Sequence, residues 1–185
     1  MQRTAPRHAI PSKVPLPCEQ RGVTFPVFLL FVAVAAGYVG YSGLHMPTLV
    51  ASHFGASGIA DAFMPRSRYL TMMLCVTVLL PMVVTVPLSI GLSNPNLKIN
   101  LPNRDYWLAP EHREETVTYI RQQMLRFGVA LLLFICFAHW LVARANAHTP
   151  PMLSLVSLVS GLLVFGAYAI IWIALHYTRF RHVPE

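Results

Sequence analysis

The chain has 185 residues, of which 55% are hydrophobic and only 11% are charged, whereas an ordinary soluble domain carries roughly 25% charged residues. This composition excludes a soluble globular domain and predicts an integral membrane protein, because the surplus of apolar side chains must contact lipid. The formal net charge of +7 is typical of the basic residues that set membrane topology. We therefore expect the lipid bilayer, and no nucleic acid, as a partner.

Four apolar segments contain no Asp, Glu, Lys or Arg. A helix needs about 20 apolar residues to cross a hydrocarbon core about 30 Å thick, and these segments meet or approach that length. They are residues 25–44, 70–92, 127–143 and 153–175. We therefore predict an all-α fold, an integral membrane four-helix bundle that occupies residues 25–175.

The segment before the first span is polar and contains four prolines. Because it has no periodic apolar face, we predict that residues 1–24 form a disordered tail. Residues 176–185 are expected to form a second, short tail. The first span is expected to be retained rather than cleaved, because its apolar run exceeds the roughly 7 to 15 residues of a signal-peptide core.

Basic residues are distributed unevenly between the connections. Of the 14 Lys and Arg residues, only Arg66, Arg68 and Arg144 lie between spans one and two or between spans three and four. Cytoplasmic segments carry an excess of Lys and Arg. We therefore predict that the N-terminus, the C-terminus and residues 93–126 are cytoplasmic, and that residues 45–69 are extracytoplasmic.

The extracytoplasmic connection contains signals of a short helix. Pro47 precedes an apolar run that ends at Gly55, and Pro at the start and Gly after the end are typical of helix boundaries. We predict a short extracytoplasmic helix over residues 48–54. A turn at Gly58 is expected to follow it.

Four histidines fall in the outer half of this topology, and they are weak candidates for a zinc or copper site together with Asp61. They are His45, His53, His139 and His148. Their spacing is not a known ligand pattern, and the other four histidines are expected on the cytoplasmic side. We therefore predict neither a metal ion nor another cofactor.

His139 is the only histidine inside a predicted span. An ionisable group at that depth is either functional or neutral and hydrogen-bonded to a backbone or Ser partner. We favour the second interpretation.

Small residues recur at three- and four-residue spacing on the first and fourth spans. They are Ala33, Ala36, Gly37 and Gly40 on the first, and Ser154, Ser157, Ser160 and Gly161 on the fourth. Small side chains let helix backbones approach closely. We expect helix contacts at these faces, either within one chain or with a protein partner or a second copy in a homo-oligomer.

The cytoplasmic connection contains a compact polar and aromatic cluster, Asn103, Arg104, Asp105, Tyr106 and Trp107. We expect it to lie in an extended stretch over residues 100–108. Such a cluster can bind a ligand or partner, or it can anchor the loop at the membrane interface. We favour the anchor.

A long helix is predicted to follow this cluster. Glu111, Glu114 and Glu115 would lie near its N-terminus, where the helix dipole favours negative charge, and apolar residues then repeat at three and four positions. We expect one continuous helix from about Glu111 to Ala143. Its first part would be an amphipathic cytoplasmic extension of the third transmembrane helix.

Catalytic motifs are absent from the sequence. It contains no nucleophile elbow, no phosphate-binding glycine loop, no zinc protease motif and no paired carboxylates within a span. We therefore do not expect an enzyme. An ion-coupled transporter is also disfavoured, because such proteins carry buried acids or bases along their path.

Two segments, residues 47–61 and residues 100–110, resemble the bacterial domain of unknown function 1648. In that family a Pro precedes a His-Phe pair, a Gly and a turn, just after a first membrane span. Together with the flanking spans, the resemblance covers about residues 25–126. It implies a bacterial cytoplasmic (inner) membrane protein whose outer loop takes a set structure through His53, Phe54, Gly55 and Gly58.

The same domain begins some larger membrane proteins that are similar to the immunity protein against a secreted peptide toxin. We expect a binding or regulatory protein, a sensor or immunity-like, whose ligand or partner residues are the four just named, Asp61 and residues 103–107. The alternative is a structural or accessory subunit of a larger membrane complex. An outer-face metal-binding protein is a weaker alternative.

Overall fold

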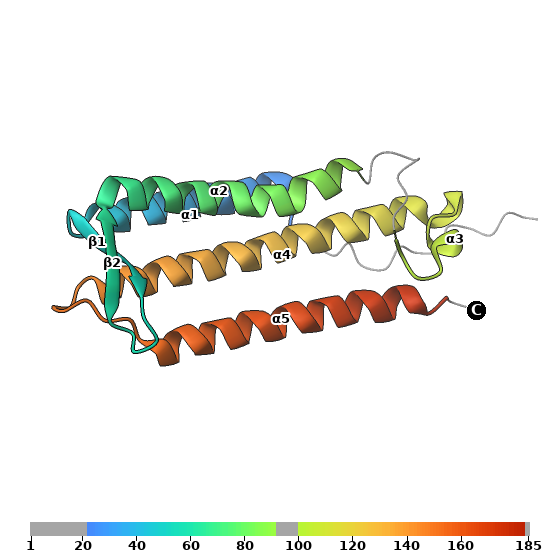
Figure 1. The fold of residues 1–185 in the computed structure, drawn as a ribbon. Helices are drawn as coiled ribbons and strands as arrows, with labels where there is room; N and C mark the ends of the chain where they lie inside the picture. Colours follow the sequence, from blue (N-terminus) through green and yellow to red (C-terminus); the bar gives the residue numbers. More distant parts are fainter. Residues whose placement is uncertain (1–21, 92–99, 184–185) are drawn as a thin grey trace, which may run out of the picture.

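The computed structural model of the chain describes residues 22–91 and 100–183. In chain order, its elements are α1 (Phe25–Leu44), β1 (Leu49–Phe54), β2 (Ala60–Pro65), α2 (Arg66–Gly91), α3 (Arg104–Trp107), α4 (Pro110–Ala145) and α5 (Leu155–Arg181) (Figure 1). Within these residues, four helices are long and apolar enough to cross a membrane: α1, α2, α4 and α5. The predicted helical membrane bundle is confirmed at this level.

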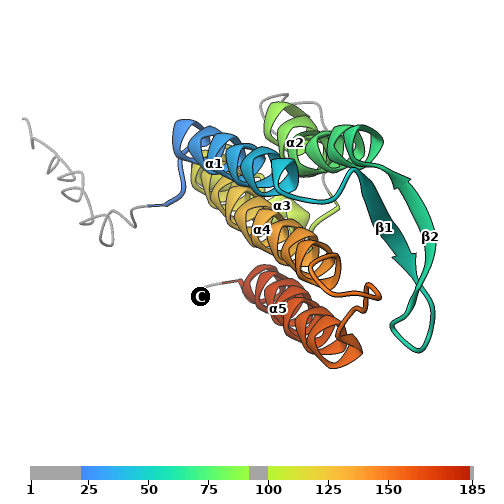
Figure 2. The same ribbon diagram turned by 90° about the vertical axis from the view of Figure 1, so that its left-hand side faces the viewer.

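The helix α4 lies at the centre of the bundle. It contacts each of the other three long helices, with α1 and α2 on one side and α5 on the other (Figure 2). The two strands lie at one end of the bundle, which we call the hairpin end. The short helix α3 lies at the opposite end, which we call the α3 end (Figure 1).

The long helices follow the apolar runs of the sequence. The bounds of α1 coincide with the first predicted span, and α4 runs without interruption from Pro110 to Ala145, which confirms the single helix predicted over 111–143. Pro110 occupies the first turn of α4, where a missing backbone N–H costs no hydrogen bond. At the other end of the chain, α5 continues to Arg181, beyond the span predicted to end at residue 175.

The prediction of a short helix over residues 48–54 is wrong. Leu49–Phe54 is a strand that pairs antiparallel with Ala60–Pro65, with Val50 opposite Met64. Gly55 does not end a helix; its N–H donates to the Ile59 carbonyl and so opens the hairpin turn. The six residues of β1 are compatible with either conformation, and the strand that stabilises them comes later in the chain.

The prediction of an extended stretch over residues 100–108 is also wrong, because Arg104–Trp107 forms the one-turn helix α3. Asn103 precedes it in the left-handed region, with φ 50°, which Asn tolerates better than most residues. The predicted disordered tail lies, as far as residue 21, outside the described residues.

The closest packing joins α1, α2 and α4. The core between α1 and α4 contains Phe28, Val32, Ala35, Leu125 and Leu132. A Cβ atom at Gly128 of α4 would lie 2.6 Å from Cγ2 of Thr85 and 2.8 Å from Cε2 of Phe28. Since these distances leave no room for a side chain, glycine is required for the three helices to approach this closely.

The two small-residue faces have different environments. A Cβ atom at Gly37 or Gly40 of α1 would meet no atom within 4 Å, whereas one at Gly161 of α5 would overlap the ring of Phe137 on α4. The face of α5 therefore contacts α4 within the chain. The face of α1 makes no such contact among the described residues at these two glycines.

Candidate functional site

The hairpin end exposes the first group of residues that the sequence singled out. His53 Nδ1 lies 2.5 Å from Asp61 Oδ1, and their side chains are 71% and 52% exposed. An exposed pair of this kind adds little to stability, but it fixes the orientation of the imidazole ring. Leu49 and Phe63 are also exposed on the two strands. A polar pair beside exposed apolar side chains can bind a partner.

Phe54 and Gly58 attach the hairpin to the rest of the bundle. Phe54 packs against a cluster formed by Leu141, Ala145 and Leu153. Gly58 has φ +81°, and a Cβ atom there would lie 2.5 Å from the Leu153 carbonyl oxygen. The Leu153 N–H donates a hydrogen bond to the Gly58 carbonyl at 2.8 Å. Gly58 therefore brings the hairpin turn against the segment that enters α5.

Asn146, which the sequence analysis did not single out, fixes the base of β1. Its side-chain amide donates to the Ala51 carbonyl at 3.0 Å, and its side-chain oxygen accepts from the Ala51 N–H at 2.7 Å. Asn146 is 7% exposed. Its position just after α4 resembles that of any polar residue that ends a helix, so the sequence carries no signal of this long-range contact.

His139 is fully buried among α1, α2 and α4. Its Nε2 lies 2.7 Å from the Ser42 hydroxyl, its Nδ1 lies 3.0 Å from the Tyr69 hydroxyl, and the ring of Tyr38 meets it edge-on. Ser42 also donates to the Tyr38 carbonyl at 2.7 Å. A neutral imidazole that donates from Nε2 and accepts at Nδ1 satisfies every hydrogen of this network.

This arrangement agrees with the favoured interpretation of His139, since Ser42 is a partner of the expected type. With 0% of its surface exposed, the imidazole presents no atom to a substrate or ligand. The network instead connects three helices through polar atoms that would otherwise be unsatisfied in an apolar surrounding.

The structure does not bring the four candidate metal ligands together. His45 Nδ1 bonds to the Tyr41 carbonyl at 2.8 Å, His53 pairs with Asp61, His139 is enclosed as described above, and His148 is exposed. In residues 22–91 and 100–183, no three His, Cys, Asp or Glu side chains form a group that could hold a metal ion. The described residues thus give no geometric support to the metal-binding alternative.

At the α3 end, two members of the polar and aromatic cluster bind the C-terminus of α5. The Asn103 side-chain amide donates to the Phe180 and Arg181 carbonyls at 3.2 and 2.7 Å. The Trp107 indole N–H donates to the Phe180 carbonyl at 3.0 Å. The last carbonyls of a helix have no partner within the helix. Asn103 and Trp107 satisfy two of them.

The other three residues of the cluster have different environments. Arg104 and Asp105 are exposed, and Tyr106 stacks on the His112 ring with 4.4 Å between the centroids. The cluster is therefore divided between residues that hold α5 and residues that face outward. The sequence does not reveal which member does which, because the carbonyls that they bind lie more than 70 residues away along the chain.

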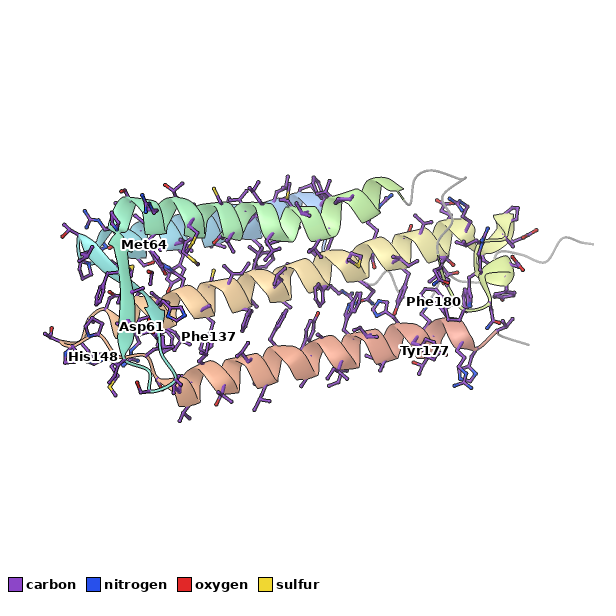
Figure 3. The ribbon with its side chains drawn as sticks, in the orientation of Figure 1. Asp61, Met64, Phe137, His148, Tyr177 and Phe180 are labelled. Carbon is purple, nitrogen blue, oxygen red and sulfur yellow. The ribbon has the colours of Figure 1, made fainter. Side chains whose placement is uncertain are left out.

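Side chains of α4 and α5 complete the contact at the α3 end. Phe180 lies at the α3 end of the bundle (Figure 3). It is buried and meets the rings of Trp107 and Tyr119 edge-on, at 5.5 and 5.9 Å. The guanidinium of Arg179 lies 4.0 Å from the centre of the Tyr119 ring and 3.5 Å from a carboxylate oxygen of Glu115. Phe180 is the one buried residue of α5.

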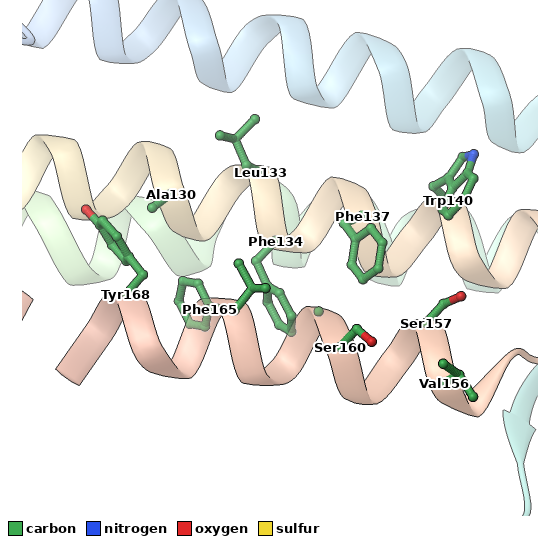
Figure 4. A pocket seen from close by; sticks show the side chains of 12 residues that line it. Ala130, Leu133, Phe134, Phe137, Trp140, Val156, Ser157, Ser160, Phe165 and Tyr168 are labelled. Atoms are coloured by element: carbon green, nitrogen blue, oxygen red, sulfur yellow. The ribbon is translucent and has the colours of Figure 1, made fainter. Parts of the chain in front are cut away.

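Between the two ends of α5, a groove of about 690 Å³ runs along the line where α5 packs on α4. Aromatic rings from both helices line it, including Phe134, Phe165 and Tyr168, and Trp140 and Ser157 lie toward the hairpin end (Figure 4). The rings of Phe134 and Phe165 stack with centroids 4.7 Å apart. Large rings on facing helices hold the two backbones apart where small residues would let them meet.

Comparison of the chain with known protein families, with curated proteins and with solved structures finds no match.

Proposed function

We propose that this is a binding or regulatory membrane protein that recognises a ligand or partner at its hairpin end and transmits that event along α5 to its α3 end. One observation carries the proposal: the two surfaces that the sequence singled out hold the same helix by its two ends. Gly58 binds the segment entering α5, and Asn103 and Trp107 bind the segment where α5 ends.

The distribution of basic residues supports an orientation for this device. With 11 of 14 Lys and Arg residues on the α3 side or in the tails, the positive-inside rule places the hairpin outside and α3 in the cytoplasm. The exposed His53–Asp61 pair would then face the exterior, where a peptide, a lipid or another protein can reach it. The resemblance to the bacterial domain of unknown function 1648 includes segments at both ends of the bundle, and it stays a prediction.

The small buried core of α5 supports transmission along that helix. Phe180 is the one buried residue of α5, and the middle of the helix contacts α4 through partly exposed rings such as Phe165 on Phe134. By contrast, α1 and α4 share a core of five buried residues. A helix with little buried core can slide by a small amount against the helix on which it packs. A ligand that binds the hairpin more tightly in one position of α5 would bias that shift.

The experiment is complementation of a deletion strain by single variants expressed at native level. His53→Ala removes the exposed imidazole, and Trp107→Phe removes one hydrogen bond at the opposite end. Both should fail to restore the lost phenotype while the protein still accumulates in the membrane. Tyr177→Phe is the matched control at the α3 end, because Tyr177 is exposed and no hydrogen bond of its hydroxyl is formed among the described residues.

Two outcomes would contradict the proposal. Loss of membrane abundance in both variants would mean that His53 and Trp107 are purely structural. Full complementation by both variants would mean that neither surface is needed for the function.

A second candidate function is that of an accessory subunit in a larger membrane complex. The observation that favours it is the open small-residue face of α1, where a Cβ atom added at Gly37 or Gly40 would meet no atom within 4 Å. Gly37→Leu should then leave the isolated chain folded but remove a stoichiometric partner from the protein purified in mild detergent. A wild-type protein that purifies as a monomer would count against this function.

A further inference from the structure

We propose that the groove between α4 and α5 is a binding site for one anionic phospholipid, with an acyl chain in the groove and the headgroup phosphate on Arg144. This inference is independent of what the hairpin recognises. It rests on the shape of the groove, on its position in the bundle and on the side chains at one of its ends.

The groove opens within the apolar part of the bundle. The stretches 127–143 and 153–175, which contain its lining residues, have no Asp, Glu, Lys or Arg. In a membrane, this opening therefore faces hydrocarbon rather than water. Its volume of about 690 Å³ falls within the roughly 300–1,000 Å³ typical of small-molecule sites. Aromatic walls with few polar atoms fit a flexible alkyl chain.

Polar groups occur at the hairpin end of the groove. Trp140 lines it there, and the guanidinium of Arg144, one helical turn further on, lies 5.0 Å from the centre of the Trp140 ring. Ser157 and Ser160 line the groove on the α5 side, toward the same end (Figure 4). The groove therefore changes from apolar to polar toward its hairpin end, as a phospholipid does from its acyl chain to its headgroup. Trp140 and the two serine hydroxyls would lie beside the ester groups, and Arg144 beside the phosphate.

Arg144 is available for a phosphate. It is exposed and forms no ion pair within the part of the chain that the structure describes, whereas Arg66, at the same end, donates to the Leu44 and Met46 carbonyls. The Ser160 hydroxyl likewise has no hydrogen-bond partner among the described residues. The permanent positive charge of the Arg144 guanidinium favours a headgroup with a net negative charge.

The experiment is native mass spectrometry of the full chain in detergent, titrated with phosphatidylglycerol. The wild type should retain one lipid per chain. Arg144→Gln should weaken this retention by about tenfold, as expected for the loss of one charge-assisted hydrogen bond. Ser160→Phe should fill the mouth of the groove and abolish retention. Both residues are exposed, so neither variant should disturb folding.

Each variant has a matched control. Arg68→Gln removes another exposed guanidinium at the same end, and Val159→Phe adds the same ring to an exposed position of α5 that does not line the groove. Both controls should retain lipid as the wild type does. Equal retention in Arg144→Gln and Arg68→Gln would overturn the phosphate contact. Equal retention in Ser160→Phe and Val159→Phe would overturn the site.

Two further outcomes would also overturn the proposal. If phosphatidylcholine is retained as tightly as phosphatidylglycerol, the site does not select anionic lipid. If the wild type is a dimer without bound lipid and Ser160→Phe makes it a monomer, a helix of a second copy occupies the groove instead.

Discussion

The two sides of α4 use different chemistry to contact their neighbours. Toward α1 and α2, Gly128 lets the backbones approach and His139 joins all three helices through hydrogen bonds. Toward α5, the rings of Phe134 and Phe165 keep the helices apart along a groove. Close approach and satisfied buried polar groups make the first side a fixed unit. The second side is held by ring contacts along the groove and by hydrogen bonds at the two ends of α5.

We expect the largest effect from removing His139, whose hydrogen bonds join α1, α2 and α4. His139→Ala leaves a cavity and deprives the Ser42 and Tyr69 hydroxyls of their partner, so we expect a loss of about 3 kcal/mol in the free energy of unfolding. Unfolding in mixed detergent micelles measures it. His148→Ala, which removes an exposed imidazole at the same end, is the control; similar effects of the two variants would mean that the network does not stabilise the bundle.

Gly128→Val tests the close approach on the same side. A side chain there would overlap Thr85 and Phe28, so the three helices must separate, at an expected cost of about 2 kcal/mol. The same unfolding measurement applies. Gly166→Val on α5 is the control, because a Cβ atom at Gly166 meets nothing within 4 Å. If both variants lose the same free energy of unfolding, close helix packing does not distinguish the α1–α2 side of α4 from its α5 side.

Gly58→Ala tests the attachment of α5 at the hairpin end. The left-handed φ of Gly58 costs an L-residue about 1–2 kcal/mol, and the added Cβ atom would press on the Leu153 carbonyl. Faster amide hydrogen exchange at Leu153 and in the first turn of α5 should result. Gly55→Ala, where the nearest atom would be 3.4 Å away, should leave that exchange unchanged; equal acceleration by both would place the effect in the hairpin turn alone.

The smallest effect is expected at the opposite attachment. Trp107→Phe keeps the ring that packs on Phe180 but removes the indole N–H that binds its carbonyl, which should cost about 1 kcal/mol. The expected readout is faster amide exchange in the last turn of α5 with no change in α1. Unchanged exchange in α5 would show that the Asn103 side chain alone holds this end.

The helices could be predicted from the sequence because their signals are local. A charge-free run of sufficient length predicts α1 at its observed bounds, and the apolar repeat from Val117 onward predicts that α4 is continuous. The hairpin could not be predicted in this way. The run Leu49–Phe54 fits one helical turn as well as a short strand, and the choice depends on pairing with Ala60–Pro65.

The roles of the site residues were less predictable than their positions. Asn103 and Trp107 belong to a cluster that its composition singles out, but their partners are backbone carbonyls at the far end of the chain. Every residue has a backbone carbonyl, so the sequence does not indicate which ones a side chain will bind. Asn146 likewise binds backbone atoms, those of Ala51, which the sequence does not indicate. The role of His139 could be predicted in part. Burial of an imidazole in an apolar helix requires a polar partner, but only the fold identifies the two partners, Ser42 and Tyr69.

The side chain of Asn146 has a consequence for how the hairpin can meet another protein. An unpaired strand edge offers a template for strand addition or aggregation. Here the amide of Asn146 takes both backbone groups of Ala51 on the edge of β1, and the Pro151 carbonyl takes the N–H of Ala60 on β2. An added strand therefore cannot hydrogen-bond to Ala51 or to the Ala60 N–H, and the side chains of the hairpin are what these two positions leave for a partner to contact.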